Sequence, residues 1–375
     1  DVPKPARDAE LGADDQPGLG NAAGVLDLSL IVQRALDFAV MGVVVEPGME
    51  TNPRGAVAVK GFDIGRMQRR GARAGIDLGP EVGEPQKRQV HTLLADALAQ
   101  KADTVITCGG AQSNHCRATA IAAAMLGINC RLILRTPDPS NPPPLEGNIL
   151  LDRMAGAEIV WITPDEYKQR DELMANEAAS LQASGRKAYT IPMGASDALG
   201  ALGYIRIMEE LVNDIANSLG GGNRPCTIIN AVGSGGTSAG LILGAKLFDV
   251  RARIAGVNVS DDRSHFVQAI GDICEQAIAD YHLDVEFSRQ GDVEIIDGYV
   301  GEGYGLSKDE ELDLICDVAR TEGIFLDPVY TGKAFFGMIQ ELKRDPKCFG
   351  EQIIFLHTGG IFGLFPKAAQ IRPLL

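Results

Sequence analysis

The sequence has no long apolar run and no closely spaced pair of cysteines. No stretch reaches the roughly 18–20 apolar residues that a membrane-spanning helix needs, and the longest candidate is the short AVMGVVVEP. The seven cysteines are scattered singly, without a CxxC pair. This spacing indicates neither a zinc site nor a disulfide framework. We therefore expect a soluble protein in the cytoplasm or another reducing compartment.

Positive charge is also scarce. The chain has 35 Lys and Arg residues against 50 Asp and Glu residues, which gives a formal net charge of −15. This excess of negative charge argues against nucleic acid or an anionic membrane as a partner, so we expect a small-molecule partner. The five histidines lie far apart without the spacing of metal ligands, and we expect no metal site.

The length of the chain predicts more than one domain. A single hydrophobic core rarely grows beyond roughly 250–300 residues, and this chain has 375, of which 45% are hydrophobic. Residues 1–24 are rich in Pro, Gly, Ala and Asp without periodicity, so we expect a flexible extension there. Because the sequence does not begin with Met, N-terminal processing is a further expectation.

Strand and helix patterns alternate from residue 103 onward. DTVITCGG, CRLILR, AEIVWI and KAYTIP have the pattern of buried strands, and helical segments separate most of them. Strands joined through a helix are parallel. We therefore predict an α/β protein of two domains with twisted, mostly parallel sheets flanked by helices. Residues 90–190 would form the smaller domain, and residues 25–89 and 191–375 the larger one.

A glycine-rich loop, GSGGT at residues 233–237, joins the predicted strand CTIINAV to a predicted helix. Its backbone N–H groups and the start of the helix suit an anion, and its two hydroxyls add donors. The loop matches neither the P-loop GxxxxGK[ST] nor the dinucleotide pattern GxGxxG. We therefore expect it to hold a monophosphate, such as that of a cofactor. The alternative is that the glycines only form a tight turn.

Four polar residues follow the strand DTVITCGG, at the end of the strand where open α/β sheets bind ligands. They are Gln112, Ser113, Asn114 and His115. Together they are suited to a substrate carboxylate, whereas a simple helix N-cap would explain only one of them. His115 is either a base or a locally hydrogen-bonded side chain.

Six ordered motifs carry a resemblance to a known family. GGAQSNHCRATA, MGASDALGALGY, GSGGTSAGL, VGEGYG, LDPVYTGKA and FLHTGG occur in this order within residues 86–366. Together they resemble the D-cysteine desulfhydrase and 1-aminocyclopropane-1-carboxylate deaminase family. The resemblance implies the tryptophan-synthase-β fold (fold type II), pyridoxal 5′-phosphate as cofactor and a homodimer. It also implies β-elimination or ring opening of a small amino acid or analogue.

The resemblance further implies roles for single residues. The cofactor phosphate would be held by Gly233, Ser234, Gly235, Gly236 and Thr237, and the pyridine nitrogen would be approached by Thr358. The substrate carboxylate would be met by Gln112, Ser113 and Asn114. Catalysis would involve Ser113 in proton transfer, with Tyr304 and Tyr330 as the hydroxyls that flank the reacting amino acid.

The sequence departs from the family where the Schiff-base lysine belongs. The family motif resembles GGNKxRKLE, and an ungapped alignment through LLADALA places Gln86 on the lysine and Gln89 on the second lysine. Glutamine has no basic nitrogen. Either Lys87 serves instead, or the cofactor binds without a covalent link, or the pocket has lost the cofactor. In the last case it would have other chemistry on a small carboxylate or a non-catalytic binding role. Because the other motifs are retained, we favour a catalytic pocket with modified chemistry.

Overall fold

The computed structural model describes residues 43–45, 60–61, 86–218 and 225–375, with side chains for residues 88–212 and 225–375. The predicted extension at residues 1–24 lies outside the described residues. Within the described part, no helix is long and apolar enough to cross a membrane. The described strands form two separate sheets.

The first sheet contains the four strands predicted between residues 103 and 192. Its strand order is β5-β4-β3-β6, and every neighbouring pair is parallel. The strands are β3 (Thr104–Gly110), β4 (Asn129–Arg135), β5 (Glu158–Ile162) and β6 (Ala188–Thr190). The prediction of parallel strands here is confirmed.

The second sheet has the order β2-β1-β10-β7-β8-β9. Four strands are parallel, whereas β1 is antiparallel to both of its neighbours. The strands are β1 (Val43–Val45), β2 (Lys60–Gly61), β7 (Cys226–Val232), β8 (Ala252–Asn258), β9 (Glu294–Ile296) and β10 (Ile353–Phe355). The predicted α/β class with two mostly parallel sheets is thereby confirmed.

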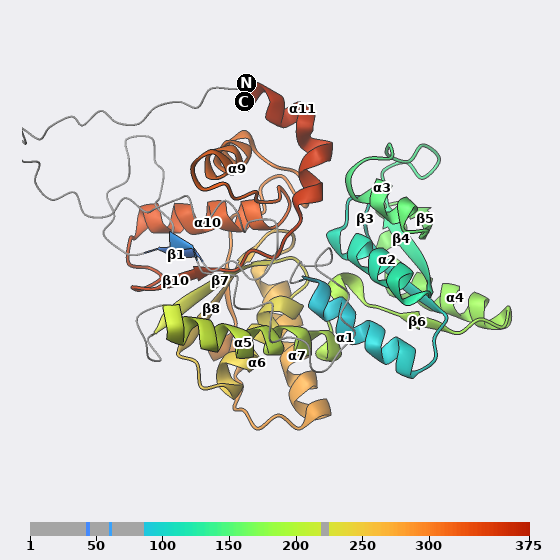
Figure 1. Cartoon of the computed structure of the whole chain (residues 1–375), viewed down its shortest axis with the longest axis horizontal. Coiled ribbons are helices and arrows are strands. Elements are labelled where there is room, and N and C mark those ends of the chain that lie inside the picture. The colour runs from blue at the N-terminus through green and yellow to red at the C-terminus, as the bar shows by residue number, and fades with distance from the viewer. Residues whose placement is uncertain (1–42, 46–59, 62–85, 219–224) are drawn as a thin grey trace, which may run out of the picture.

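Helices alternate with these strands and cover both sheets (Figure 1). The longer helices are α1 (Gln86–Ala99), α2 (Asn114–Leu126), α3 (Gly147–Met154), α4 (Arg170–Ala183), α5 (Ala198–Ser218), α6 (Gly236–Leu247), α7 (Arg263–Tyr281), α9 (Asp309–Glu322) and α10 (Thr331–Arg344). The short ones are η5 (Glu166–Gln169), η6 (Met193–Ala195), α8 (Arg289–Asp292), η7 (Ile361–Lys367), α11 (Ala368–Ile371) and η8 (Arg372–Leu374).

The six-stranded sheet lies between two helical layers, with α9 and α10 on one side and α5, α6 and α7 on the other (Figure 1). The pleat explains this arrangement, because successive side chains of a strand point to opposite faces. Ile228 packs in the cluster with α5, α6 and α7. Its neighbour Ile229 packs in the cluster with α9 and α10. Each buried strand therefore contributes to two cores.

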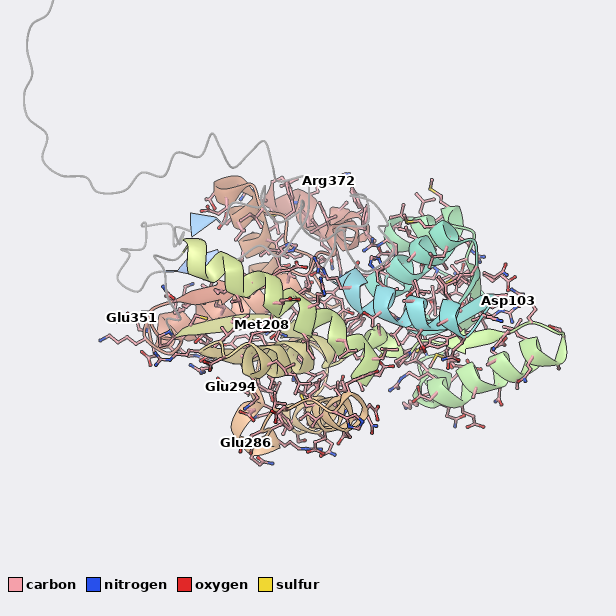
Figure 2. The ribbon with its side chains drawn as sticks, turned by 60° about the horizontal axis from the view of Figure 1, so that its bottom comes forward. Asp103, Met208, Glu286, Glu294, Glu351 and Arg372 are labelled. Carbon is pink, nitrogen blue, oxygen red and sulfur yellow. The ribbon has the colours of Figure 1, made fainter. Side chains whose placement is uncertain are left out.

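Two glycines let α5 and α6 pack closely. A Cβ atom at Gly240 would lie 2.4 Å from the carbonyl oxygen of Ala201, and one at Gly244 would lie 2.7 Å from the Cβ of Met208. Met208 is completely buried, and Figure 2 shows it on α5, between Glu351 on the left and Asp103 on the right. The close contact fixes α6, whose first turn carries part of the glycine-rich loop.

Helix α5 begins earlier than the sequence indicates. The segment MGASDALGALG has the composition of a turn, yet α5 starts at Ala198. Asp197 explains the start, since its Oδ1 accepts a hydrogen bond of 2.7 Å from the N–H of Gly200. Such a cap satisfies a donor that the first helical turn leaves unpaired.

Candidate active site

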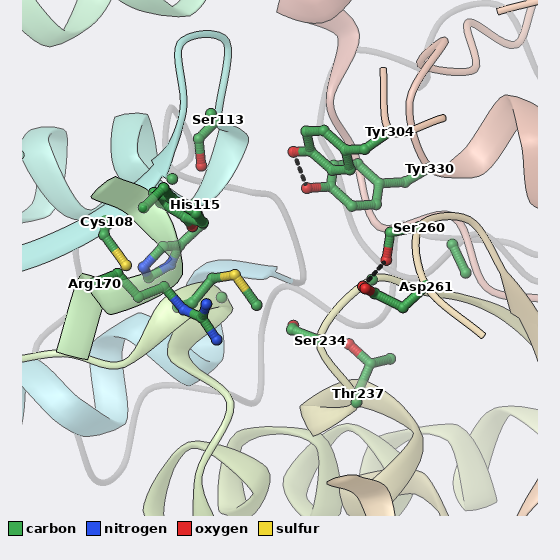
Figure 3. A pocket seen from close by; sticks show the side chains of 18 of the residues that line it. Cys108, Ser113, His115, Arg170, Ser234, Thr237, Ser260, Asp261, Tyr304 and Tyr330 are labelled. Carbon is green, nitrogen blue, oxygen red and sulfur yellow. Dashed lines mark hydrogen bonds between the residues drawn. The ribbon is translucent and has the colours of Figure 1, made fainter. Parts of the chain in front are cut away.

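A cavity of about 440 Å³ opens where the carboxyl ends of β3 and β4 face that of β7. Figure 3 shows Ser113, His115 and Arg170 on one side of it and Tyr304, Tyr330 and Asp261 on the other. Parallel strands place their following loops at one edge of the sheet, where such proteins bind ligands. The cavity is therefore the candidate active site.

The glycine-rich loop lines this cavity after β7. Gly235 adopts a left-handed backbone with φ of +96°, which glycine tolerates without strain. The hydroxyl of Ser234 lies 2.7 Å from that of Ser196, whose oxygen also accepts from the N–H of Gly236 at 3.2 Å. A Cβ atom at Gly236 would collide with Ser196, at 2.7 Å from its Oγ. The loop thus forms a narrow cradle at the start of α6.

Gln89 supplies a further donor beside this cradle. Its side chain lines the cavity, and only 2% of the residue is exposed. Its Nε2 has no hydrogen-bond partner among the described residues, and it lies 2.4 Å from the position of a Cβ at Gly236. Buried amide donors are nearly always paired. The orphaned donor, the loop N–H groups and the start of α6 together fit an anionic group such as a phosphate.

Tyr304 and Tyr330 form a pair across from the α2 side of the cavity. Their hydroxyl oxygens are 2.5 Å apart, and their rings meet edge to face at 5.8 Å. Burial raises the pKa of both phenols above the ordinary value. Both hydroxyls are therefore protonated at neutral pH, and the pair is able to relay a proton.

Each tyrosine is held by a buried ionisable residue. The carboxylate of Asp327 accepts from the N–H groups of Tyr330 and Thr331, at 3.0 and 2.6 Å. The Nζ of Lys333 donates to the carbonyls of Val300 and Gly303, at 2.5 and 2.9 Å. Both charged residues are fully buried, so they fix the two loops that present the phenols.

Ser113 and His115 line the cavity at the start of α2. The Oγ of Ser113 caps the helix by accepting from the N–H of Cys116 at 3.2 Å. The Nε2 of His115 lies 2.7 Å from the Oγ1 of Thr107, whereas its Nδ1 has no partner among the described residues. Burial lowers the pKa of His115 to about 4, so the ring is neutral at pH 7.

Gln112 and Asn114 do not line this cavity. Both are bound to Asn148 of α3: Gln112 Oε1 accepts from its backbone N–H at 2.8 Å, and Asn114 Oδ1 accepts from its Nδ2 at 2.9 Å. Successive residues of a helix point about 100° apart, so Asn114 and His115, the first two residues of α2, face different directions. Of the four residues expected to meet a carboxylate, Ser113 and His115 line the cavity, whereas the side chains of Gln112 and Asn114 are held by Asn148.

Thr358, the remaining residue with an expected cofactor contact, lines the cavity in the loop after β10. Gln86 and Lys87 are the first two residues of α1, and their side chains lie outside the described ones. The next residue, Arg88, anchors this helix start to α5 through two hydrogen bonds to Glu210, of 2.5 and 2.9 Å. Of the lysines with a described side chain, Lys168 alone lines the cavity.

Several lining residues escaped the sequence analysis. They include Arg135, Tyr167, Arg170, Asp261 and His265, whereas Gln89 entered that analysis only as the residue aligned with the second lysine of the family motif. Only Arg135 had a usable signal, because it ends a predicted strand at the ligand-binding edge. The others reach the cavity from separate helices and loops. Among the residues that the structure describes, no three His, Cys, Asp or Glu side chains form a metal-binding group.

The chain is similar to known proteins over most of its length. The model of the family "Pyridoxal-phosphate dependent enzyme" matches residues 86–359. The bifunctional mitochondrial D-cysteine desulfhydrase/1-aminocyclopropane-1-carboxylate deaminase of Arabidopsis thaliana is 40% identical over 305 residues, which are 79% of this chain and 73% of the relative. A putative 1-aminocyclopropane-1-carboxylate deaminase of Thermotoga maritima is 39% identical over 298 residues, 79% of this chain and 90% of the relative.

Solved structures of similar proteins are also known. The crystal structure of an ACC deaminase homologue is 36% identical, with a TM-score of 0.70, and covers 80% of this chain and 87% of its own. O-ureido-L-serine synthase is 15% identical with a TM-score of 0.54, covering 76% of this chain and 83% of its own, and shows similarity of fold alone.

Proposed function

This chain belongs to the pyridoxal-phosphate-dependent enzyme family, and from that premise we propose that it is a lyase or deaminase acting on a small amino acid or a close analogue. The reaction would be a β-elimination, which yields a 2-oxo acid, ammonia and the departing β-substituent, or a ring opening, which yields a 2-oxo acid and ammonia. One observation carries the proposal: the hydroxyl pair of Tyr304 and Tyr330 shares a cavity with the anion cradle of the glycine-rich loop.

The chain's own residues fit the family's cofactor. The N–H groups of residues 233–237, the hydroxyls of Ser234 and Thr237 and the orphaned Nε2 of Gln89 would hold its phosphate. Thr358 would approach the pyridine nitrogen. Bound pyridoxal phosphate supplies an electron sink that weakens the bonds at Cα of an amino acid.

The other residues of the cavity would bind the amino acid and move its protons. The Oγ of Ser113 would bind the substrate carboxylate and share in proton transfer. The phenols of Tyr304 and Tyr330 stay protonated because burial raises their pKa, so the pair would donate a proton at the carbon where a bond breaks. His115 would remain a neutral hydrogen-bonding group.

Lys87 is our candidate for the amine that Gln86 does not supply. An amine near the cofactor both binds it covalently and serves as a base. The second candidate function is a non-catalytic protein that binds a small carboxylate, and the glutamine at position 86 favours it.

The first test is an absorption spectrum of the purified protein with pyridoxal phosphate, followed by borohydride reduction and peptide mapping. We expect a visible band and a reduced label on Lys87. Incubation with D-cysteine and with 1-aminocyclopropane-1-carboxylate, with assays for 2-oxo acid and ammonia, would then separate the two functions. If there is no visible band, no label and no product, the non-catalytic binding function remains as the candidate.

We also propose that the protein is a homodimer, as the resemblance implies. Sedimentation equilibrium would measure its mass against the 39.8 kDa of one chain. A mass of one chain at micromolar concentration would contradict this.

A further inference from the structure

The cavity is lined by cations although the chain as a whole is acidic. Three basic residues, Arg135, Lys168 and Arg170, line it, and Asp261 is the only carboxylate among the described residues that line it. The formal net charge of the chain is −15. A cleft with walls of one sign concentrates ligands of the opposite sign.

Two of these cations share one aromatic ring. The guanidinium carbon of Arg135 lies 4.6 Å from the ring centre of Tyr167, and that of Arg170 lies 5.5 Å from it. Arg135 also lies 5.1 Å from the ring centre of Tyr304. Stacking on aromatic faces orients a guanidinium and leaves its N–H edge available for an anion.

Neither arginine has a carboxylate partner among the described residues, in contrast to a nearby one. Arg131, four residues before Arg135 on β4, forms ion pairs with Glu158 and Glu177 at 2.6 and 2.5 Å. Lys168, the third cation of the cavity, pairs with Asp165 at 2.8 Å. Among the three described cations that line the cavity, the two arginines on Tyr167 therefore lack the carboxylate partner that Lys168 has.

Arg170 has two further features of a ligand-binding residue. Its Nε is buried and has no hydrogen-bond partner among the described residues, although buried donors are normally paired. It is also the first residue of α4, where the helix dipole disfavours a cation and favours an anion. Figure 3 shows its guanidinium pointing into the cavity, toward the side that carries Ser234 and Asp261.

We propose that Arg135 and Arg170, stacked on Tyr167, form a subsite for a second oxyanion of the substrate. The substrate is then an amino acid whose side chain carries an acidic group in addition to its α-carboxylate. This inference rests on the proposed function, because it assigns the substrate class of the same cavity. A guanidinium binds an oxyanion by charge-assisted hydrogen bonds and does not bind a neutral amide in the same way.

The test is calorimetric binding of aspartate and of asparagine, each as D and L enantiomer, to the full chain saturated with pyridoxal phosphate. The two amino acids are nearly isosteric and differ in the charge of the side chain. We expect aspartate of one enantiomer to bind about tenfold more tightly than asparagine. The ratio of the asparagine Kd to the aspartate Kd should fall close to one in Arg170→Gln and in Arg135→Gln. Lys168→Gln, the matched loss of a cation in the same lining, should preserve it.

Four results would overturn the subsite. The first is that wild-type protein binds aspartate and asparagine equally. The second is that Lys168→Gln lowers the preference for aspartate as much as Arg170→Gln does. The third is that Arg170→Gln weakens the binding of pyridoxal phosphate and leaves the ratio unchanged, which would make Arg170 a phosphate ligand. The fourth is that Arg170→Gln and Asp261→Asn each weaken the binding of aspartate and of asparagine equally. That result is expected if Arg170 and Asp261 form an ion pair when the cavity closes.

Failure of the proposed function has a different signature. If the protein releases no 2-oxo acid or ammonia from any amino acid but still prefers aspartate through Arg170, the subsite stands and catalysis does not.

Discussion

The hydroxyl oxygens of Tyr304 and Tyr330 lie 2.5 Å apart, although 26 residues separate them in the chain. Tyr304 comes from the loop between β9 and α9, and Tyr330 is the residue before α10. A hydrogen bond between two phenols leaves one proton directed at the partner and the other available to the cavity. The pair is thus a unit, and removal of either hydroxyl affects both.

Tyr330→Phe should lower kcat by about 10²- to 10⁴-fold, the range for loss of a positioned acid or base. The hydroxyl is lost while the ring that packs against Gly233 remains, so the melting temperature should change little. Steady-state kinetics and thermal melting would measure both quantities.

The matched control for this change is Tyr299→Phe, because the hydroxyl of Tyr299 donates to Glu341 and does not line the cavity. An equal loss of kcat in both variants would contradict a specific role for Tyr330.

Gly236→Ala should weaken the binding of pyridoxal phosphate by at least about tenfold. The new Cβ would lie 2.4 Å from Gln89 Nε2 and 2.7 Å from Ser196 Oγ, so the added methyl group would displace both side chains from the cradle. An absorbance titration with the cofactor measures the change. Gly291→Ala is the control, since its Cβ would meet only Ser288, at 3.3 Å. Unchanged affinity in Gly236→Ala would place the phosphate elsewhere.

Lys333→Met should loosen the loop that carries Tyr304. The change leaves the carbonyls of Val300 and Gly303 without their donor, and an unsatisfied buried group costs about 1–3 kcal/mol. Urea unfolding should show this loss, and kcat should fall because Tyr304 is no longer held against Tyr330. Lys343→Met, an exposed position on the same helix, should change neither. If Lys333→Met lost stability but kept full kcat, the loop would not need this anchor.

The buried ring of His115 should make the protein less stable in acid. Burial depresses the pKa of His115 from 6.5 to about 4, so the unfolded chain takes up a proton before the folded chain does. The contribution of the neutral, buried ring to the free energy of unfolding is complete above pH 6.5 and is lost as the pH falls toward 4. It amounts to about 3 kcal/mol from the 1.36 kcal/mol per pKa unit.

The difference in unfolding free energy between wild type and His115→Gln isolates this effect. Denaturant curves at several pH values should show wild type losing more stability than the variant between pH 6.5 and 4. Parallel pH profiles for the two proteins would contradict the buried neutral state of the ring.

Much of the fold follows from local patterns in the sequence. The strands β3 and β7 are mainly apolar runs that end in glycine or are followed by it, and such runs form strands that are buried on both faces. The glycines and hydroxyls of residues 233–237 indicate an anion loop because backbone N–H groups and a helix start are local features. The same locality explains why Ser113 is predictable as a residue of the site, since it directly follows a strand that ends there.

The tertiary structure decided which polar residues face the cavity. Gln112 and Asn114 have the same chemistry as a carboxylate-binding pair, yet Asn148 takes their hydrogen bonds. That partner lies more than 30 residues away, on α3. Conversely, Arg135 at the end of β4 reaches the ring of Tyr167 on η5, more than 30 residues further along the chain, and Arg170 contacts the same ring. Sequence fixes each local conformation through backbone and side-chain preferences, whereas contacts between distant segments depend on how the helices and sheets pack.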